Sequence, residues 1–160
     1  MKSIFRTILV AMAVALFAQA ALAEEAKADA PKAKHAATPA KLVTMAPDEL
    51  KWVANPANAD VSMAVVWGDP TKGAHGAFHK FKPGFNAGLH THSADMKLVV
   101  VSGTMIAATE GGPEKKLPPG SYEYQPHGVK HVTKCDTGSE CVIFVVASGK
   151  FDLTPAEGKK

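Results

Sequence analysis

Short apolar segments rich in β-branched and aromatic residues follow one another from about residue 61 to residue 148. Glycine, proline and other turn residues separate them, as between neighbouring strands. We expect strands at 61–68, 74–82, 89–92, 96–102, 104–109, 121–125, 129–135 and 141–148. Residues 46–50 predict a short helical turn, and residues 110–116 an exposed loop. Short strands at near-regular spacing are typical of an all-β sandwich or barrel.

The first 23 residues have the pattern of a Sec-type signal peptide. Two basic residues precede an apolar run at 7–18, and Ala21-Leu22-Ala23 is a small-x-small cleavage sequence. A membrane anchor is the alternative, but the run is short and ends at this cleavage sequence. We therefore expect cleavage after Ala23, a periplasmic or secreted product, and no membrane span after cleavage.

Residues 24–41 consist mostly of alanine, lysine and proline and contain no large apolar residue. Such a segment cannot bury enough surface to offset its ordering entropy, so we expect a flexible tether with a solvated His35. Residues 42–160 would then form one domain. Loss of the signal peptide leaves 16 basic against 15 acidic residues. This balance gives no reason to expect nucleic acid or an anionic membrane as a partner.

Three histidines provide the candidate chemistry. His90 and His92 are separated by one residue in an expected strand, where alternate side chains share a face and can converge. His131 lies in another expected strand, shortly after Pro126-His127-Gly128. Converging neutral imidazoles bind iron, manganese, zinc, nickel or copper. A metal site at His90, His92 and His131 is therefore our hypothesis, with the identity of the metal open.

The two stretches that carry these histidines resemble the two sequence motifs of the cupin family. The matching positions are Gly84, His90, His92 and Gly103 in the first motif, and Gly120, Pro126, Gly128 and His131 in the second. The resemblance covers roughly residues 61–151 and implies a single-domain cupin jelly-roll barrel with a metal at the histidines. Two positions depart from it: Met96 stands where the motif has glutamate, and Cys135 where it has asparagine.

The missing glutamate leaves the fourth metal ligand open. Asp95 lies one residue before the motif position, so strand parity turns it away unless a bulge shifts it. Glu123 and Cys135 are further candidates, and Met96 itself is expected to pack in the core. We favour three histidines plus water.

The two cysteines, Cys135 and Cys141, flank an expected turn. In an exported protein this arrangement favours a disulfide. The alternative makes Cys135 a metal ligand, because it lies four residues after His131 on the same strand and shares its face.

Several residues have no assigned face at this stage. His75 and His79 share one face of a strand and are expected to be polar surface residues, with His79 at the barrel mouth as the alternative. His127 is expected to be solvated. Either Tyr122 and Tyr124 or Glu123 and Gln125 point inward. The apolar residues available to line a pocket are Val99, Val101, Ile106, Val132, Ile143 and Phe144.

These features predict an exported cupin that binds a divalent transition metal and a small-molecule ligand or substrate. A metalloenzyme of the dioxygenase or isomerase type is one hypothesis. A non-catalytic module that binds or senses a metal or ligand is the alternative, and a structural or interaction protein is a third. The fold alone does not decide among them. Whether the chain forms a homodimer is also open.

Overall fold

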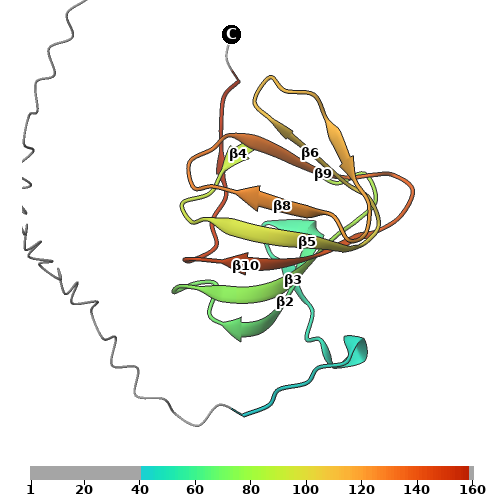
Figure 1. Ribbon diagram of the computed structural model, residues 1–160, viewed down its shortest axis with the longest axis vertical. Helices are drawn as coiled ribbons and strands as arrows, with labels where there is room; N and C mark the ends of the chain where they lie inside the picture. The colour runs from blue at the N-terminus through green and yellow to red at the C-terminus, as the bar shows by residue number, and fades with distance from the viewer. Residues whose placement is uncertain (1–40, 159–160) are drawn as a thin grey trace, which may run out of the picture. The chain divides into compact units, whose positions relative to one another are not determined.

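The computed structural model describes residues 41–158, which form two antiparallel sheets in a jelly roll. One sheet has the strand order β1-β2-β3-β10-β5-β8, and the other has the order β11-β4-β9-β6-β7. Figure 1 shows β5 and β10 beside each other in one layer, with β6 and β9 in the other. The expected signal peptide and His35 lie outside the described residues, as does the expected tether except for Lys41.

The strands of the first sheet are β1 (Val53–Asn55), β2 (Asn58–Gly68), β3 (His75–Phe81), β5 (Met96–Ser102), β8 (Tyr122–Gln125) and β10 (Cys141–Ala147). Those of the second sheet are β4 (Asn86–Thr91), β6 (Met105–Thr109), β7 (Lys115–Leu117), β9 (His131–Cys135) and β11 (Thr154–Pro155).

All eight strands expected from the sequence are present, seven of them with shifted ends and 96–102 with the expected ones, and the short helical turn is a 3₁₀ helix, η1 (Pro47–Glu49). Three strands were missed: β1, β7 and β11. Each has only two or three residues, too few to show an alternating pattern. The interpretation of 110–116 as an exposed loop is wrong at its end, where β7 begins. Within residues 41–158, no helix is long and apolar enough to cross a membrane.

The core lies on the face that the two sheets turn toward each other. In β10, Ile143 and Val145 are buried between the sheets, whereas Val146 points outward. In β5, Leu98 and Val100 are buried in the same way. This alternation follows from the two-residue period of a strand.

The same period corrects five of the six residues considered for the pocket lining. Val99 and Val101 point outward and are 40% and 48% exposed. Phe144 also faces outward, with its ring centroid 4.9 Å from that of Phe78. Ile106 and Val132 are half-buried outside the cavity, so only Ile143 lines it. Without the register of the sheets, the sequence offered no way to choose between the two faces.

Two motif glycines have roles in the backbone structure. Gly103 has a φ of +71°, and a Cβ atom there would lie 2.3 Å from the carbonyl oxygen of Glu140, so no other residue fits. Gly128 lies in the turn before His131, and its N–H donates to the carbonyl oxygen of His92 at 2.9 Å. The second motif is thereby bonded to the first.

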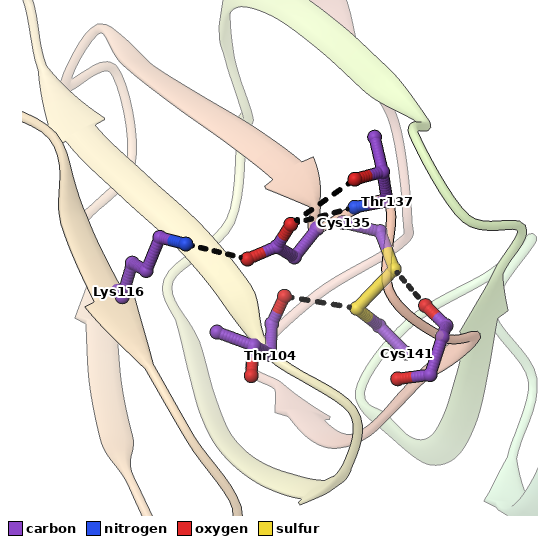
Figure 2. The surroundings of a disulfide bond; sticks show 7 residues. Thr104, Lys116, Cys135, Thr137 and Cys141 are labelled. Atoms are coloured by element: carbon purple, nitrogen blue, oxygen red, sulfur yellow. Dashed lines mark hydrogen bonds and ion pairs between the residues drawn. A yellow bond between two sulfur atoms is a disulfide. The ribbon is translucent and has the colours of Figure 1, made fainter.

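A disulfide joins Cys135, at the end of β9, to Cys141, at the start of β10. Because β9 and β10 belong to different sheets, the bond links the two layers covalently. Figure 2 shows its surroundings: the carbonyl oxygen of Thr104 lies 3.1 Å from Cys141 Sγ, and Lys116 forms an ion pair with Asp136 at 2.7 Å. The predicted disulfide is confirmed. It removes Cys135 from the possible metal ligands, since neither sulfur is a free thiolate.

Candidate metal centre

His90, His92 and His131 converge, as the sequence predicted. His90 in β4 and His131 in β9 are direct cross-strand partners, and His92 follows the end of β4. One ring nitrogen from each of the three lies within 4.8 Å of the others, and all three side chains are buried. The ring centroids are 4.3 to 5.1 Å apart. The cluster could therefore hold a metal ion.

Backbone carbonyl groups fix the orientation of all three rings. Each Nδ1 atom lies within hydrogen-bonding distance of a carbonyl oxygen, which can only accept, so Nδ1 carries the proton. The acceptors are Gly88 for His90 at 2.9 Å, Val129 for His131 at 2.9 Å, and Asp152 for His92 at 2.5 Å. In the neutral form of each ring, Nε2 is then the nitrogen with the free lone pair, and it is the atom that can bind a metal.

The electrostatics at His90 and His92 favour neutral rings. Burial lowers the pKa of His90 to about 4 and also lowers that of His92. His131 Nε2 is buried and has no hydrogen-bond partner among residues 41–158. A buried polar atom without a partner is costly, and a metal ion would satisfy it. The donor set therefore fits a divalent transition metal.

The segment after β10 completes the site, which no pattern in the sequence indicated. Strand β11 pairs with β4, so that Thr154 lies opposite Thr91. Two residues before Thr154, the carboxylate of Asp152 accepts from the backbone N–H of Ser93 at 2.8 Å and from the Ser93 hydroxyl at 2.5 Å. These bonds hold the carbonyl oxygen of Asp152 at His92. We call residues 149–157 the C-terminal strap.

The cluster contains no carboxylate. Met96, at the position of the motif's glutamate, is buried in the core as expected. The carboxylate of Asp95 accepts from the backbone N–H of His127 at 2.9 Å, lies 2.8 Å from the His127 ring nitrogen Nδ1, and accepts from the hydroxyl of Tyr124 at 3.2 Å. Asp95 is thus committed to the turn of the second motif and lies outside the cluster. His127 is exposed, as expected, but its ring pairs with Asp95.

Strand β8 turns Glu123 and Gln125 inward and leaves Tyr122 and Tyr124 exposed. Glu123 Oε1 accepts from the amide of Gln125 at 3.1 Å. Burial raises the pKa of Glu123, while the hydrogen bond from Gln125 and the proximity of His131 oppose the rise. Glu123 is near the histidines but is not part of the cluster.

A cavity of about 410 Å³ adjoins the cluster and is lined in part by His90 and His92. Its other polar lining comes from His79, Gln125, Thr133 and three asparagines. The rest is apolar and includes Phe81, Phe85, Leu98 and Phe151. This volume lies within the range of small-molecule sites, roughly 300–1,000 Å³.

The expectation that His75 and His79 are surface residues is wrong. Both are buried, because β3 lies between β2 and β10 and turns this face inward. His75 Nδ1 donates to the carbonyl oxygens of Gly73 and Gly149, at 3.0 and 3.1 Å, and ties the strap to β3. His79 faces the cavity, and burial lowers its pKa to about 3. The shared strand parity was visible in the sequence, but the face was not.

Comparison with known proteins identifies the fold and a family. A family with the description "Domain of unknown function (DUF4437)" matches residues 19–158. No curated protein matches the chain.

Three solved structures illustrate the likeness. A chain from a study of the DMSP lyases RdDddP and RnDddQII is 19% identical, with a TM-score of 0.55; the match covers 68% of this chain and 63% of that one. The polyketide cyclase RemF from Streptomyces resistomycificus is 16% identical, with a TM-score of 0.59 and coverages of 75% and 89%. A cupin-2 domain from Rhodospirillum rubrum is 11% identical, with a TM-score of 0.57 and coverages of 75% and 83%. The chain thus spans less than two thirds of the DMSP lyase. The cupin fold expected from the two motifs is confirmed.

Proposed function

The chain belongs to the family described as "Domain of unknown function (DUF4437)", and we propose that it is an exported enzyme that acts on a small molecule with one divalent transition metal ion. His90, His92 and His131 would hold the metal through Nε2. The observation that carries the proposal is the common orientation of the three rings, each with Nδ1 committed to a carbonyl oxygen. A metal bound there would supply Lewis-acid or redox chemistry, which suits an isomerase or a dioxygenase.

Phe151, His79 and the apolar lining of the cavity favour the binding of a ligand. The ring of Phe151, a residue of the strap, lies against His79 and His92, with centroid separations of 5.2 and 5.8 Å. His79 Nε2 is buried and has no partner among the described residues, so it is free to hydrogen-bond a ligand. The apolar lining excludes water and strengthens polar interactions at the histidines.

The similar structures support an enzyme only by analogy. Two of them are named as a lyase and a cyclase, and a shared fold at this identity does not transfer an activity. Their names agree with chemistry on a small organic substrate in the same barrel interior.

A non-catalytic module that binds or senses a metal or ligand is the second candidate. One observation favours it: within the described part of the chain, no Asp, Glu, Lys, Arg, Tyr or Cys lines the cavity. Proton transfer there would depend on His79 or on a group outside the lining. Turnover that is lost with the metal would support the enzyme, whereas ligand binding without turnover would support the module.

Export is part of the proposal and rests on the signal-peptide pattern of residues 1–23. The disulfide supports it, because such bonds persist in oxidising compartments. Protein recovered from the periplasm or medium should begin at Glu24. An intact N-terminus on all of the protein, with none outside the cytoplasm, would contradict export.

Metal analysis of the exported protein, purified without added metal, tests the central claim. We expect about one equivalent of iron, manganese, zinc, nickel or copper per chain. Protein that contains no such metal and does not take one up on dialysis would refute the proposal.

A further inference from the structure

We propose that the ligand is a compact organic acid with one anionic head, which binds at the three histidines, and an uncharged, mainly apolar body. This inference rests on the proposed function, because the head requires the metal. It adds the chemical class of the ligand, which the histidine cluster alone does not define.

Apart from its histidines, the cavity wall offers no ionisable side chain to pair with a second charge. Within the described residues, its lining contains no Asp, Glu, Lys or Arg. The carboxyl group of Glu123 also faces inward, but it lies outside the lining, and its Oε1 accepts from Gln125, which belongs to the lining. A remote phosphate, carboxylate or ammonium group on the ligand would be desolvated without a partner, which is costly.

Polar recognition away from the histidines is also sparse. The three asparagines of the lining, Asn55, Asn58 and Asn86, each accept a backbone N–H two residues further along the chain at 2.9 Å. The amide of Gln125 lies 3.5 Å from the hydroxyl of Thr133 and 3.1 Å from Glu123. The side-chain oxygens of the three asparagines are therefore used as acceptors within the protein, so the hydroxyl donors of a sugar would find few acceptors in this part of the wall.

Aromatic and aliphatic side chains supply most of the remaining wall. The rings of Phe81 and Phe85 are stacked, with centroids 4.9 Å apart and an interplanar angle of 7°. Leu98 and Ile143 extend this apolar surface from the neighbouring strands β5 and β10. A planar or branched apolar body would bury its surface here, in a volume that keeps the ligand small.

The test uses full-length mature protein loaded with cobalt, whose visible spectrum reports ligand binding at the metal. Acetate, phenylacetate and 4-carboxyphenylacetate share the same carboxylate head. Acetate has no body beyond a methyl group, phenylacetate has an apolar body, and 4-carboxyphenylacetate has a charged one. We expect phenylacetate to bind at least tenfold more tightly than acetate, because the apolar wall removes the phenyl ring from water. We expect 4-carboxyphenylacetate to lose this gain.

A charge placed in the wall provides the matched variant. Leu153 lines the cavity and is 41% exposed, so Leu153→Lys can be accommodated, and Leu153→Gln serves as the uncharged control. The lysine variant should recover several-fold affinity for 4-carboxyphenylacetate, and the glutamine variant should not. If both variants recover this affinity equally, or if neither recovers it, charge does not govern the exclusion of a second charged group, and that part of the inference is overturned.

The outcomes separate this inference from the proposed function. Cobalt retention with equal affinities for the three acids, or with tightest binding of the dicarboxylate, overturns the inference and leaves the metal site intact. Failure of the protein to retain cobalt overturns the proposed function, and the inference falls with it.

Discussion

The ring nitrogen Nδ1 of His92 lies 2.5 Å from the carbonyl oxygen of Asp152, sixty residues further along the chain. One of the three candidate metal ligands is thus oriented by the C-terminal strap, whereas His90 and His131 are oriented by carbonyl groups two residues before them. The geometry of the site therefore depends on how firmly the strap is attached to β4.

The attachment can be weakened without changing the carbonyl group itself. Asp152→Ala removes the carboxylate that accepts two hydrogen bonds from Ser93. Loss of such indirect support typically lowers metal affinity by about 10- to 100-fold, and we expect a value near tenfold because the carbonyl oxygen remains. Competition with a chromogenic chelator would measure it.

Ser93→Ala provides the matched control, because it removes the hydroxyl and keeps the backbone N–H that donates to Asp152. We expect a smaller loss of affinity than in Asp152→Ala. Unchanged affinity in both variants would show that the strap does not position His92.

The histidine cluster itself is tested by His90→Ala combined with His92→Ala. The double variant should retain no metal, while the disulfide and the two sheets keep the barrel folded. Elemental analysis measures the metal, and circular dichroism checks the fold. A folded double variant with the metal content of the wild type would exclude these residues as ligands.

The disulfide should contribute to stability and be present in exported protein. A loop of this size gives about 2 kcal/mol in the chain-entropy model, so Cys135→Ser combined with Cys141→Ser should lower the free energy of unfolding by about that amount. Urea denaturation measures this loss. Mass analysis of the exported wild type should show no alkylatable thiol; two free thiols there would contradict the bond.

The pH dependence of metal-free protein follows from the buried imidazoles. His79 and His90 have pKa values lowered by burial from 6.5 to about 3 and about 4. Between about pH 6.5 and pH 4 the unfolded chain therefore binds more protons than the folded one, so stability falls as the pH falls. Each such group contributes up to about 1.4 kcal/mol per pH unit in this window.

Urea denaturation at several pH values, in the presence of a chelator, would measure this slope. His79→Leu removes one of the titrating groups and should flatten the slope. A free energy of unfolding that stays constant between pH 6.5 and pH 4.5 would contradict burial of neutral imidazoles.

The features that could be read from the sequence are those that depend on local patterns. Segments rich in β-branched and aromatic residues, with turn residues between them, identified eight strands, and the two motifs identified the cupin fold and placed His90, His92 and His131 together. The cysteine spacing predicted the disulfide. Each of these inferences needed only a short stretch of chain, or a motif in which the long-range pairing is already implied.

The features that were missed depend on the pairing of distant segments. Burial of His75 and His79 results from the position of β3 in the middle of its sheet. The hydrogen bond from His92 to Asp152 results from β11, a strand of two residues with no periodic signal. The outward turn of Val99 and Val101 required the register of β5 against β10. In each case the local sequence is compatible with either face.

Met96 stands at the position where the cupin motif has glutamate. Met96 is buried beside the cavity that His90 and His92 line, so a carboxylate introduced there by Met96→Glu would face the cluster. We expect metal affinity to rise by at least tenfold, because a charged oxygen ligand joins three neutral nitrogen ligands. Azide should then perturb the cobalt spectrum less than in the wild type, because an open coordination position is filled.

Asp95→Asn is the control, since Asp95 bonds to His127 and Tyr124 and lies outside the cluster. It should leave both the metal affinity and the azide response close to those of the wild type. If Asp95→Asn alone removes the metal, the carboxylate next to Met96 is a ligand and the three-histidine site is wrong. A wild type that shows no response to azide would indicate a closed site, and would favour the non-catalytic module over the enzyme.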